Sequence, residues 1–219
     1  MGDNMMKFQE EMSELRRNTM AMAELTENMV ERSLDILLTM DLDGAERMVD
    51  DFVKVDRYDR KVEEQAIRIL TLYQPMASDM RAVATYMKCI TYMERIAKYC
   101  KNIAVATQYM KGKLQYDIVS CLKPMGDTAT QMVGIVIDGL KNVSVDGFDR
   151  ITDMDNLLDN ALREDMKSII DFITKNPESA DVCTYYISVM KYLERIGDHA
   201  CKIAEKVTFM VTGFHAVID

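Results

Sequence analysis

Residues that interrupt helices are scarce, with only three prolines and nine glycines in a chain of 219 residues. They fall between long stretches in which apolar side chains recur with helical period, and no stretch alternates apolar and polar side chains for long. The pattern therefore excludes a β-sheet architecture. We predict six helices, over approximately residues 5–40, 44–73, 77–111, 115–142, 147–175 and 177–212.

Histidine is scarce as well, and its placement argues against an enzyme. Neither His199 nor His215 lies three residues after a glutamate, which is the spacing that a carboxylate-bridged di-iron enzyme uses. The sequence shows no persuasive base for a serine or cysteine nucleophile and no glycine-rich phosphate loop. We therefore predict that the protein is not an enzyme, and we keep a carboxylate-bridged metalloenzyme or a metal-storage helical bundle as the alternative.

Long apolar runs and a leader sequence are also missing. No uninterrupted apolar run approaches the roughly 20 residues of a membrane span, and residues 1–12, MGDNMMKFQEEM, lack the apolar core of a signal peptide. Five cysteines without CxxC spacing suit a reducing compartment. The formal net charge of −9 argues against nucleic-acid binding, which needs a basic surface. We expect a cytoplasmic protein without membrane insertion.

What the sequence does contain is a repeat. Residues 92–104 read YMERIAKYCKNIA, and residues 192–205 read YLERIGDHACKIAE, one hundred positions later. Each follows a helix that starts with acidic residues and leads to a proline, over residues 59–75 and 155–177. Because short connections make consecutive helices antiparallel neighbours, we predict an all-α fold. It consists of two tandem three-helix bundles with a pseudo-two-fold relation, over residues 1–112 and 113–219.

The expected ends of the last helix have recognisable capping residues. Asn176 directly precedes Pro177, so we predict that the asparagine side chain caps the helix and that the proline takes its first position. Gly213 stands where this helix should stop. Another glycine, Gly197, lies inside the same expected helix. Glycine at an interior position lowers helix stability by about 1 kcal/mol relative to alanine. We expect it to let another helix or a ligand come close.

The second repeat carries two pairs of carboxylates with helical spacing. Glu194 and Asp198 are four residues apart, as are Asp155 and Asp159 on the preceding helix, so each pair shares a helix face. The hairpin at Pro177 should bring the two pairs to similar height. Four carboxylates that face one another need a compensating cation, and clusters of hard oxygen ligands bind metal ions. The sequence therefore predicts a metal site.

The first repeat has the same plan with one change. Asp59 and Glu63 are four residues apart on one helix, and Glu94 lies on the next, but Lys98 replaces the fourth carboxylate. A protonated amine cannot ligate a metal ion. We therefore predict a first site that is weaker, or that Lys98 neutralises from within.

Solvated ion pairs are the alternative explanation of these spacings. Acidic and basic residues four apart on helices commonly form exposed salt bridges. Arg195 stands next to Glu194, and Lys191 is nearby, so these cations could neutralise the acids without any metal ion.

The stretch YLERIGDHACKIAE resembles the signature helix of the PhoU family of phosphate-signalling accessory proteins. QPMASDMRAV, at residues 74–83, resembles the first hairpin of that family, and the resemblance extends over roughly residues 10–212. It implies two similar three-helix bundles with multinuclear metal sites at acidic motifs. The motif fails at Lys98, and Ala97 replaces the glycine. The positions that match are Asp155, Asp159, Glu194 and Asp198 in the second half and Asp59, Glu63 and Glu94 in the first.

The resemblance also implies a function and partners. Members of the family often form homodimers and restrain phosphate uptake and histidine-kinase signalling, through the transporter ATPase and the sensor kinase. No catalytic activity is implied. We expect the metal ion to be iron or zinc, with magnesium or manganese as alternatives.

Overall fold

The structure, a computed structural model, describes residues 2–110 and 116–218. These residues form six long helices and no strand, as the sequence predicted. Two short 3-10 turns precede the last two helices: η1 at Phe148–Arg150 and η2 at Pro177–Ser179. The helices are α1 (Gly2–Thr39), α2 (Leu42–Tyr73), α3 (Ala77–Met110), α4 (Tyr116–Asn142), α5 (Ile151–Lys175) and α6 (Ala180–Thr212).

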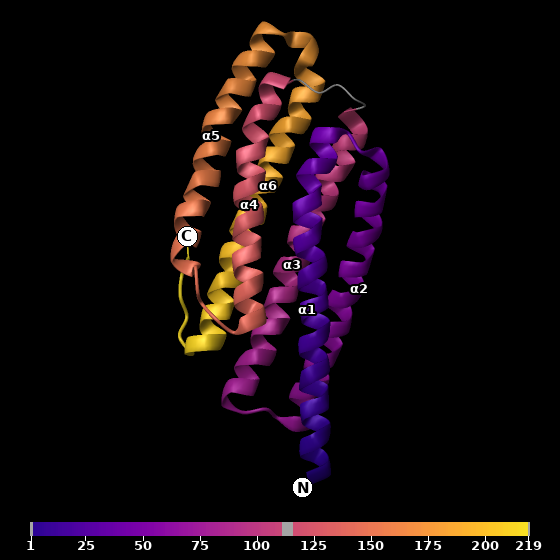
Figure 1. Ribbon diagram of the computed structural model, residues 1–219, viewed down its shortest axis with the longest axis vertical. Coiled ribbons are helices and arrows are strands. Elements are labelled where there is room, and N and C mark those ends of the chain that lie inside the picture. Colours follow the sequence, from indigo (N-terminus) through magenta and orange to yellow (C-terminus); the bar gives the residue numbers. More distant parts are fainter. Residues whose placement is uncertain (1, 111–115, 219) are drawn as a thin grey trace.

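The helices form two similar three-helix units that stand side by side, α1–α3 and α4–α6 (Figure 1). Within each unit all three helices pack on one another. Between the units, α3 packs along α6, and α1 packs along α4. Each of these contacts joins a helix to its own equivalent, which is consistent with a two-fold relation, and the predicted two-unit repeat is confirmed. The predicted boundary at residues 112–113 lies outside the described residues.

The outer helices of the two units lie far from each other. α2 packs on α1 and α3, and α5 packs on α4 and α6, so that α2 and α5 flank opposite edges of the molecule (Figure 1). The central helices α3 and α6 therefore each contact an outer helix of their own unit and the central helix of the other. Side chains on these two helices can take part in contacts within a unit and between units.

The core consists of the apolar stripes of all six helices. Met93 and Ile96 of α3 and Leu193 and Ile196 of α6 are almost completely buried, and they flank the acidic residues of the two repeated motifs. Burial of such stripes stabilises helices that would not persist alone. No helix in the described residues is both long and apolar enough to cross a lipid bilayer.

One predicted helix cap is wrong. The Asn176 side chain does not cap α6, because its Nδ2 atom donates a hydrogen bond back to the Phe172 carbonyl oxygen, 3.1 Å away, at the end of α5. Pro177 begins the turn η2 rather than α6. Gly213 does end α6, with φ at 80° and its N–H donating to the Phe209 carbonyl oxygen at 2.9 Å. Glycine adopts this left-handed backbone without strain.

Candidate metal centre

The four predicted carboxylates of the second repeat lie close enough to influence one another. Burial raises the pKa of Glu194 above its ordinary value, and the charges of Asp198, Asp159 and Asp155 raise it further, against the opposing charge of Arg195. Burial also raises the pKa of Asp198, with Asp159 adding to the effect. The hairpin between α5 and α6 therefore brings the two pairs together, as the spacing predicted.

Gly197 explains why α5 can lie so close to the acids of α6. A Cβ atom at this position would lie 2.4 Å from Cδ1 of Leu158 on α5 and 3.5 Å from Sδ of Met132 on α4. It would also lie 3.4 Å from Oδ1 of Asp155. The expectation that Gly197 admits another helix is confirmed, since both α4 and α5 approach it.

An internal cation already lies between the acids of α6. Arg195 contacts Oδ2 of Asp198 through Nη1 at 3.1 Å and Oε2 of Glu194 through Nε at 3.4 Å. The pairing of Arg195 with these acids, which the sequence offered as the alternative explanation of their spacing, is therefore present. The reason is local: a residue three positions before Asp198 on the same helix can reach its carboxylate.

The three predicted acids of the first repeat also lie close together. Burial raises the pKa of Asp59, and the charges of Glu94 and Glu63 raise it further. Lys98 is not brought to them: it is exposed, and within residues 2–110 and 116–218 no ion pair joins it to any of the three acids. Its predicted role as a neutralising cation stays a prediction.

The predicted acids offer suitable donor atoms for a metal ion, but their side chains do not point to a common centre in this structure. The described part of the chain contains no group of three or more histidine, cysteine, aspartate or glutamate side chains arranged around one point. In the second repeat, Arg195 holds Glu194 and Asp198. The donor set consists of carboxylate oxygens, which bind hard cations and occur among the ligands of zinc and iron. A cation would also relieve the repulsion that raises the pKa values.

A cavity of about 400 Å³ adjoins the second group of acids, between α3, α5 and α6. Asp155 and Asp198 line one part of it, and Tyr92 and Arg95 of α3 line another. Asp155 also accepts a hydrogen bond from the Cys201 thiol, and burial together with this carboxylate raises the pKa of Cys201. Because its walls come from both units, this cavity could not be located from either repeat alone.

His199 forms part of the cavity wall and was missed as a site residue. Its ring stacks between Tyr92 and Tyr99 of α3, at centroid distances of 5.9 and 5.8 Å. Burial lowers the pKa of His199 to about 4, and the positive charges of Arg95 and Arg195 contribute. The imidazole is therefore neutral at pH 7. The sequence offers little indication of this role, because the stacking of His199 on the tyrosines depends on the register of α3 against α6.

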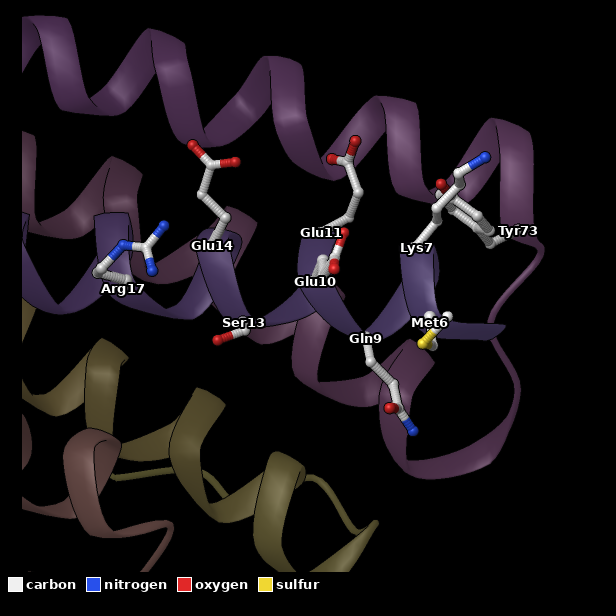
Figure 2. A pocket seen from close by; sticks show the side chains of 9 residues that line it. All are labelled: Met6, Lys7, Gln9, Glu10, Glu11, Ser13, Glu14, Arg17 and Tyr73. Carbon is white, nitrogen blue, oxygen red and sulfur yellow. The ribbon is translucent and has the colours of Figure 1, made fainter. Parts of the chain in front are cut away.

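A larger hollow, of about 620 Å³, lies at the start of α1 against the end of α2. Figure 2 shows Glu11 and Glu14 extending from α1 toward α2. There they pair with Arg68 at 3.8 Å and Lys61 at 3.7 Å. None of the predicted metal-binding residues lines this hollow, and its acids have cations from α2 beside them, so size alone does not make it the functional site.

The fold and the acidic groups define a class of protein: an all-helical, twice-repeated bundle with carboxylates gathered between the second and third helices of each unit. The chain belongs to the PhoU family, because residues 19–107 and 122–207 match the PhoU domain. One match falls within α1–α3 and the other within α4–α6.

Individual relatives match over nearly the whole chain. A phosphate-specific transport system accessory protein PhoU homolog of Zymomonas mobilis is 29% identical over 212 residues, which cover 97% of this chain and 90% of that protein. The homolog of Clostridium acetobutylicum is 24% identical over 94% of both chains. The crystal structure of PhoU from Pseudomonas aeruginosa has a TM-score of 0.88 at 25% identity, over 94% of this chain and all of that one.

Proposed function

We propose that this chain is an accessory protein of a phosphate transport system and negatively regulates phosphate uptake. The observation that carries the proposal is the full-length similarity to relatives that are named as accessory proteins of that system. The partners would be the transporter ATPase, the sensor histidine kinase, or both. The protein would act in the cytoplasm as a homodimer, without catalysing a reaction.

We also propose that the regulator binds metal ions, iron or zinc before magnesium or manganese, at the acids of the second repeat. The support is the donor set and the mutual repulsion of Glu194 and Asp198 with the acids of α5. Those residues would hold the ion, and the ion would supply the positive charge that fixes α5 against α6. Asp59, Glu63 and Glu94 would form a weaker first site.

A deletion strain tests the regulatory role. Loss of the gene should derepress phosphate transport or phosphate signalling, and the wild-type gene should restore repression. Complementation with a Glu194→Gln, Asp198→Asn double variant should restore less repression than complementation with Asp181→Asn, a control at the start of the same helix. An unchanged phosphate response in the deletion strain, with no second copy of the gene present, would contradict the proposal.

The homodimer has its own test. Sedimentation velocity at several protein concentrations should give the mass of two chains, about twice the 25.1 kDa of one. A species of 25.1 kDa at every concentration would contradict this part of the proposal.

A further inference from the structure

A row of aromatic side chains follows the line along which α3 and α6 pack on each other. Rings from the two helices stack across this line at centroid distances between 5.7 and 5.9 Å. The stacked pairs are Tyr92–His199, Tyr99–His199, Tyr99–Tyr192 and Tyr109–Tyr185. The hydroxyl groups of these tyrosines form no hydrogen bond with any residue that the structure describes. Rings that combine an apolar body with an unpaired polar tip are typical of protein interfaces.

The row adjoins a groove of about 260 Å³ between α3 and α6. Asn102 and Tyr109 of α3 line one side of it, and Ser188 and Tyr192 of α6 line the other. All of the lining residues belong to these two helices, and the side chain of Tyr109 is 62% exposed. A groove between two packed helices is a shape into which the side chains of a third helix fit.

The exposed charges along these two helices all have the same sign. Within residues 83–110 of α3 and 182–211 of α6, the exposed charged residues are Lys88, Arg95, Lys98, Lys191 and Arg195. Arg195 pairs with the acids of its own helix, whereas the other four form no ion pair in the described part of the chain. The acids of the same stretches are partly or fully buried. Since the whole chain has a net charge of −9, this face is a basic surface on an acidic protein.

The charge and the shape of the groove argue against two occupants. A second copy of this chain would present the same basic face, because a two-fold interface joins a patch to itself, and cations would then oppose cations. A lipid surface binds proteins through exposed apolar side chains that enter it. Within residues 83–110 and 182–211, Tyr109 is the one large hydrophobic residue that is exposed.

We infer that the groove between α3 and α6 binds an acidic amphipathic helix of a partner protein. The apolar face of that helix packs on the tyrosine rings, and its carboxylates pair with Arg95 and Lys191. Tyrosine and arginine are also the residue types that contribute most to binding at protein interfaces. From Tyr92 to Tyr109 the groove is about 25 Å long at the rise of an α-helix. The inference depends neither on the proposed metal site nor on the regulatory role.

Site-specific photo-cross-linking of the full chain, in the cells to which it is native, tests the inference. Benzoylphenylalanine in place of Tyr109 keeps an aromatic ring at the groove, and the same group in place of Leu157 marks an exposed position of α5. The Tyr109 position should cross-link a segment of another protein, and the Leu157 position should not. Mass spectrometry should show that this segment has a net negative charge and apolar residues at helical spacing.

Fluorescence anisotropy with a synthetic peptide of the cross-linked segment then measures its affinity for the purified chain. An Arg95→Glu, Lys191→Glu double variant should bind the peptide at least tenfold more weakly than wild type. The matched control is Arg163→Glu, Lys167→Glu, which reverses the same two charge types at exposed positions of α5 and should bind as wild type does. Circular dichroism should show both variants folded, and added salt should weaken wild-type binding.

Four results would overturn the inference. A cross-link from the Tyr109 position to a second copy of this chain or to lipid would assign the groove another occupant. A cross-linked segment without net negative charge would contradict the charge complementarity. Equal cross-linking from the Tyr109 and Leu157 positions would show that the groove has no specific partner. Equal peptide affinity in the two double variants would show that the basic residues do not recognise it. None of these results bears on the phosphate response of the deletion strain, so the regulatory role is tested separately.

Discussion

The two repeats gather acids at equivalent positions but differ in the ion pairs of their equivalent arginines, Arg95 and Arg195. In α6, Arg195 pairs with Asp198 three residues later, at 3.1 Å. In α3 the equivalent Arg95 has Lys98 at that position and lines the cavity between the units. Both arginines line this cavity, but only Arg195 has a carboxylate three residues further along its own helix. Arg195 thus lies as a cation within the second group of acids, and the role of Lys98 in the first group stays a prediction.

Two neighbouring positions differ between the repeats as well. Gly197 takes the place of Ala97, and α5 packs so closely against it that a Cβ atom would overlap Leu158. His199 takes the place of Tyr99 and stacks on the tyrosines of α3. The second repeat therefore brings α5 against a glycine at a position where the first repeat carries a buried alanine. The following variants test how much each difference contributes.

The largest effect on stability should come from filling the space at Gly197. Gly197→Val should lower the free energy of unfolding by about 2 kcal/mol, because overpacking a tight contact forces neighbouring atoms apart. Ala97→Gly in the first repeat should lower it by about 1 kcal/mol, mainly through helix propensity. Urea denaturation measures both. If Gly197→Val proved as stable as wild type, the close approach of α5 would not depend on this glycine.

The next largest effect should be on the pH dependence of the free energy of unfolding. The pKa of His199 in the folded chain, about 4, lies below its ordinary value of 6.5, so the unfolded chain binds the proton more tightly. The contribution of His199 to the free energy of unfolding is therefore fully present above pH 6.5 and is lost as the pH falls toward 4.

Wild type should lose stability between pH 6.5 and 4 because His199 takes up a proton on unfolding. His199→Phe should lose less over this range, by on the order of 1 kcal/mol after solvent screening. Urea midpoints across this range measure the slope. Tyr99→Phe, which keeps the stacked ring, should retain the slope of wild type. A slope in His199→Phe equal to that of wild type would show that the histidine is not held neutral.

The smallest effect should come from removing one acid of the first repeat. Burial and the charges of Glu94 and Glu63 raise the pKa of Asp59, so its ionised form is disfavoured in the folded chain. Asp59→Asn should stabilise the metal-free protein at pH 7 by about 0.5 kcal/mol. The gain should shrink as the pH falls through the raised pKa, where Asp59 itself becomes neutral.

The second repeat supplies the comparison for that variant. Asp198→Asn should stabilise the metal-free protein less than Asp59→Asn, because it also removes the ion pair with Arg195. Thermal denaturation of both variants at pH 7 shows which substitution stabilises the protein more. A larger gain from Asp198→Asn would show that Arg195 does not offset the repulsion among the second acids.

Local patterns in the sequence were sufficient for the helices, the repeat and the gathering of acids. Spacing along one helix determines which residues share a face, so Glu194 and Asp198 could be paired without a structure. Gly197 and Gly213 were interpreted correctly because glycine inside or after a helix has few explanations. The resemblance to the PhoU family extended the same reasoning to the function.

The features that the sequence did not predict are contacts for which a side chain has more than one possible partner. Asn176 lies between two helix ends and serves α5 rather than α6. The spacing of Arg195 and Asp198 allowed an ion pair on one helix, but it did not show that Arg195 would pair with both Asp198 and Glu194. The stacking of His199 on Tyr92 and Tyr99 depends on the register of α3 against α6, which no pattern within one repeat specifies.

The most direct test of the central claim is the metal content of two reciprocal variants, measured by mass spectrometry after loading with iron, zinc, manganese or magnesium. A fixed charge about 4 Å from a bound cation opposes it by roughly 4 kcal/mol at an effective dielectric near 20. Asp198→Lys should therefore lose metal from the second repeat, and Lys98→Asp should gain it in the first. If both variants keep the metal content of wild type, these carboxylates are surface charges and the protein has no metal centre at them.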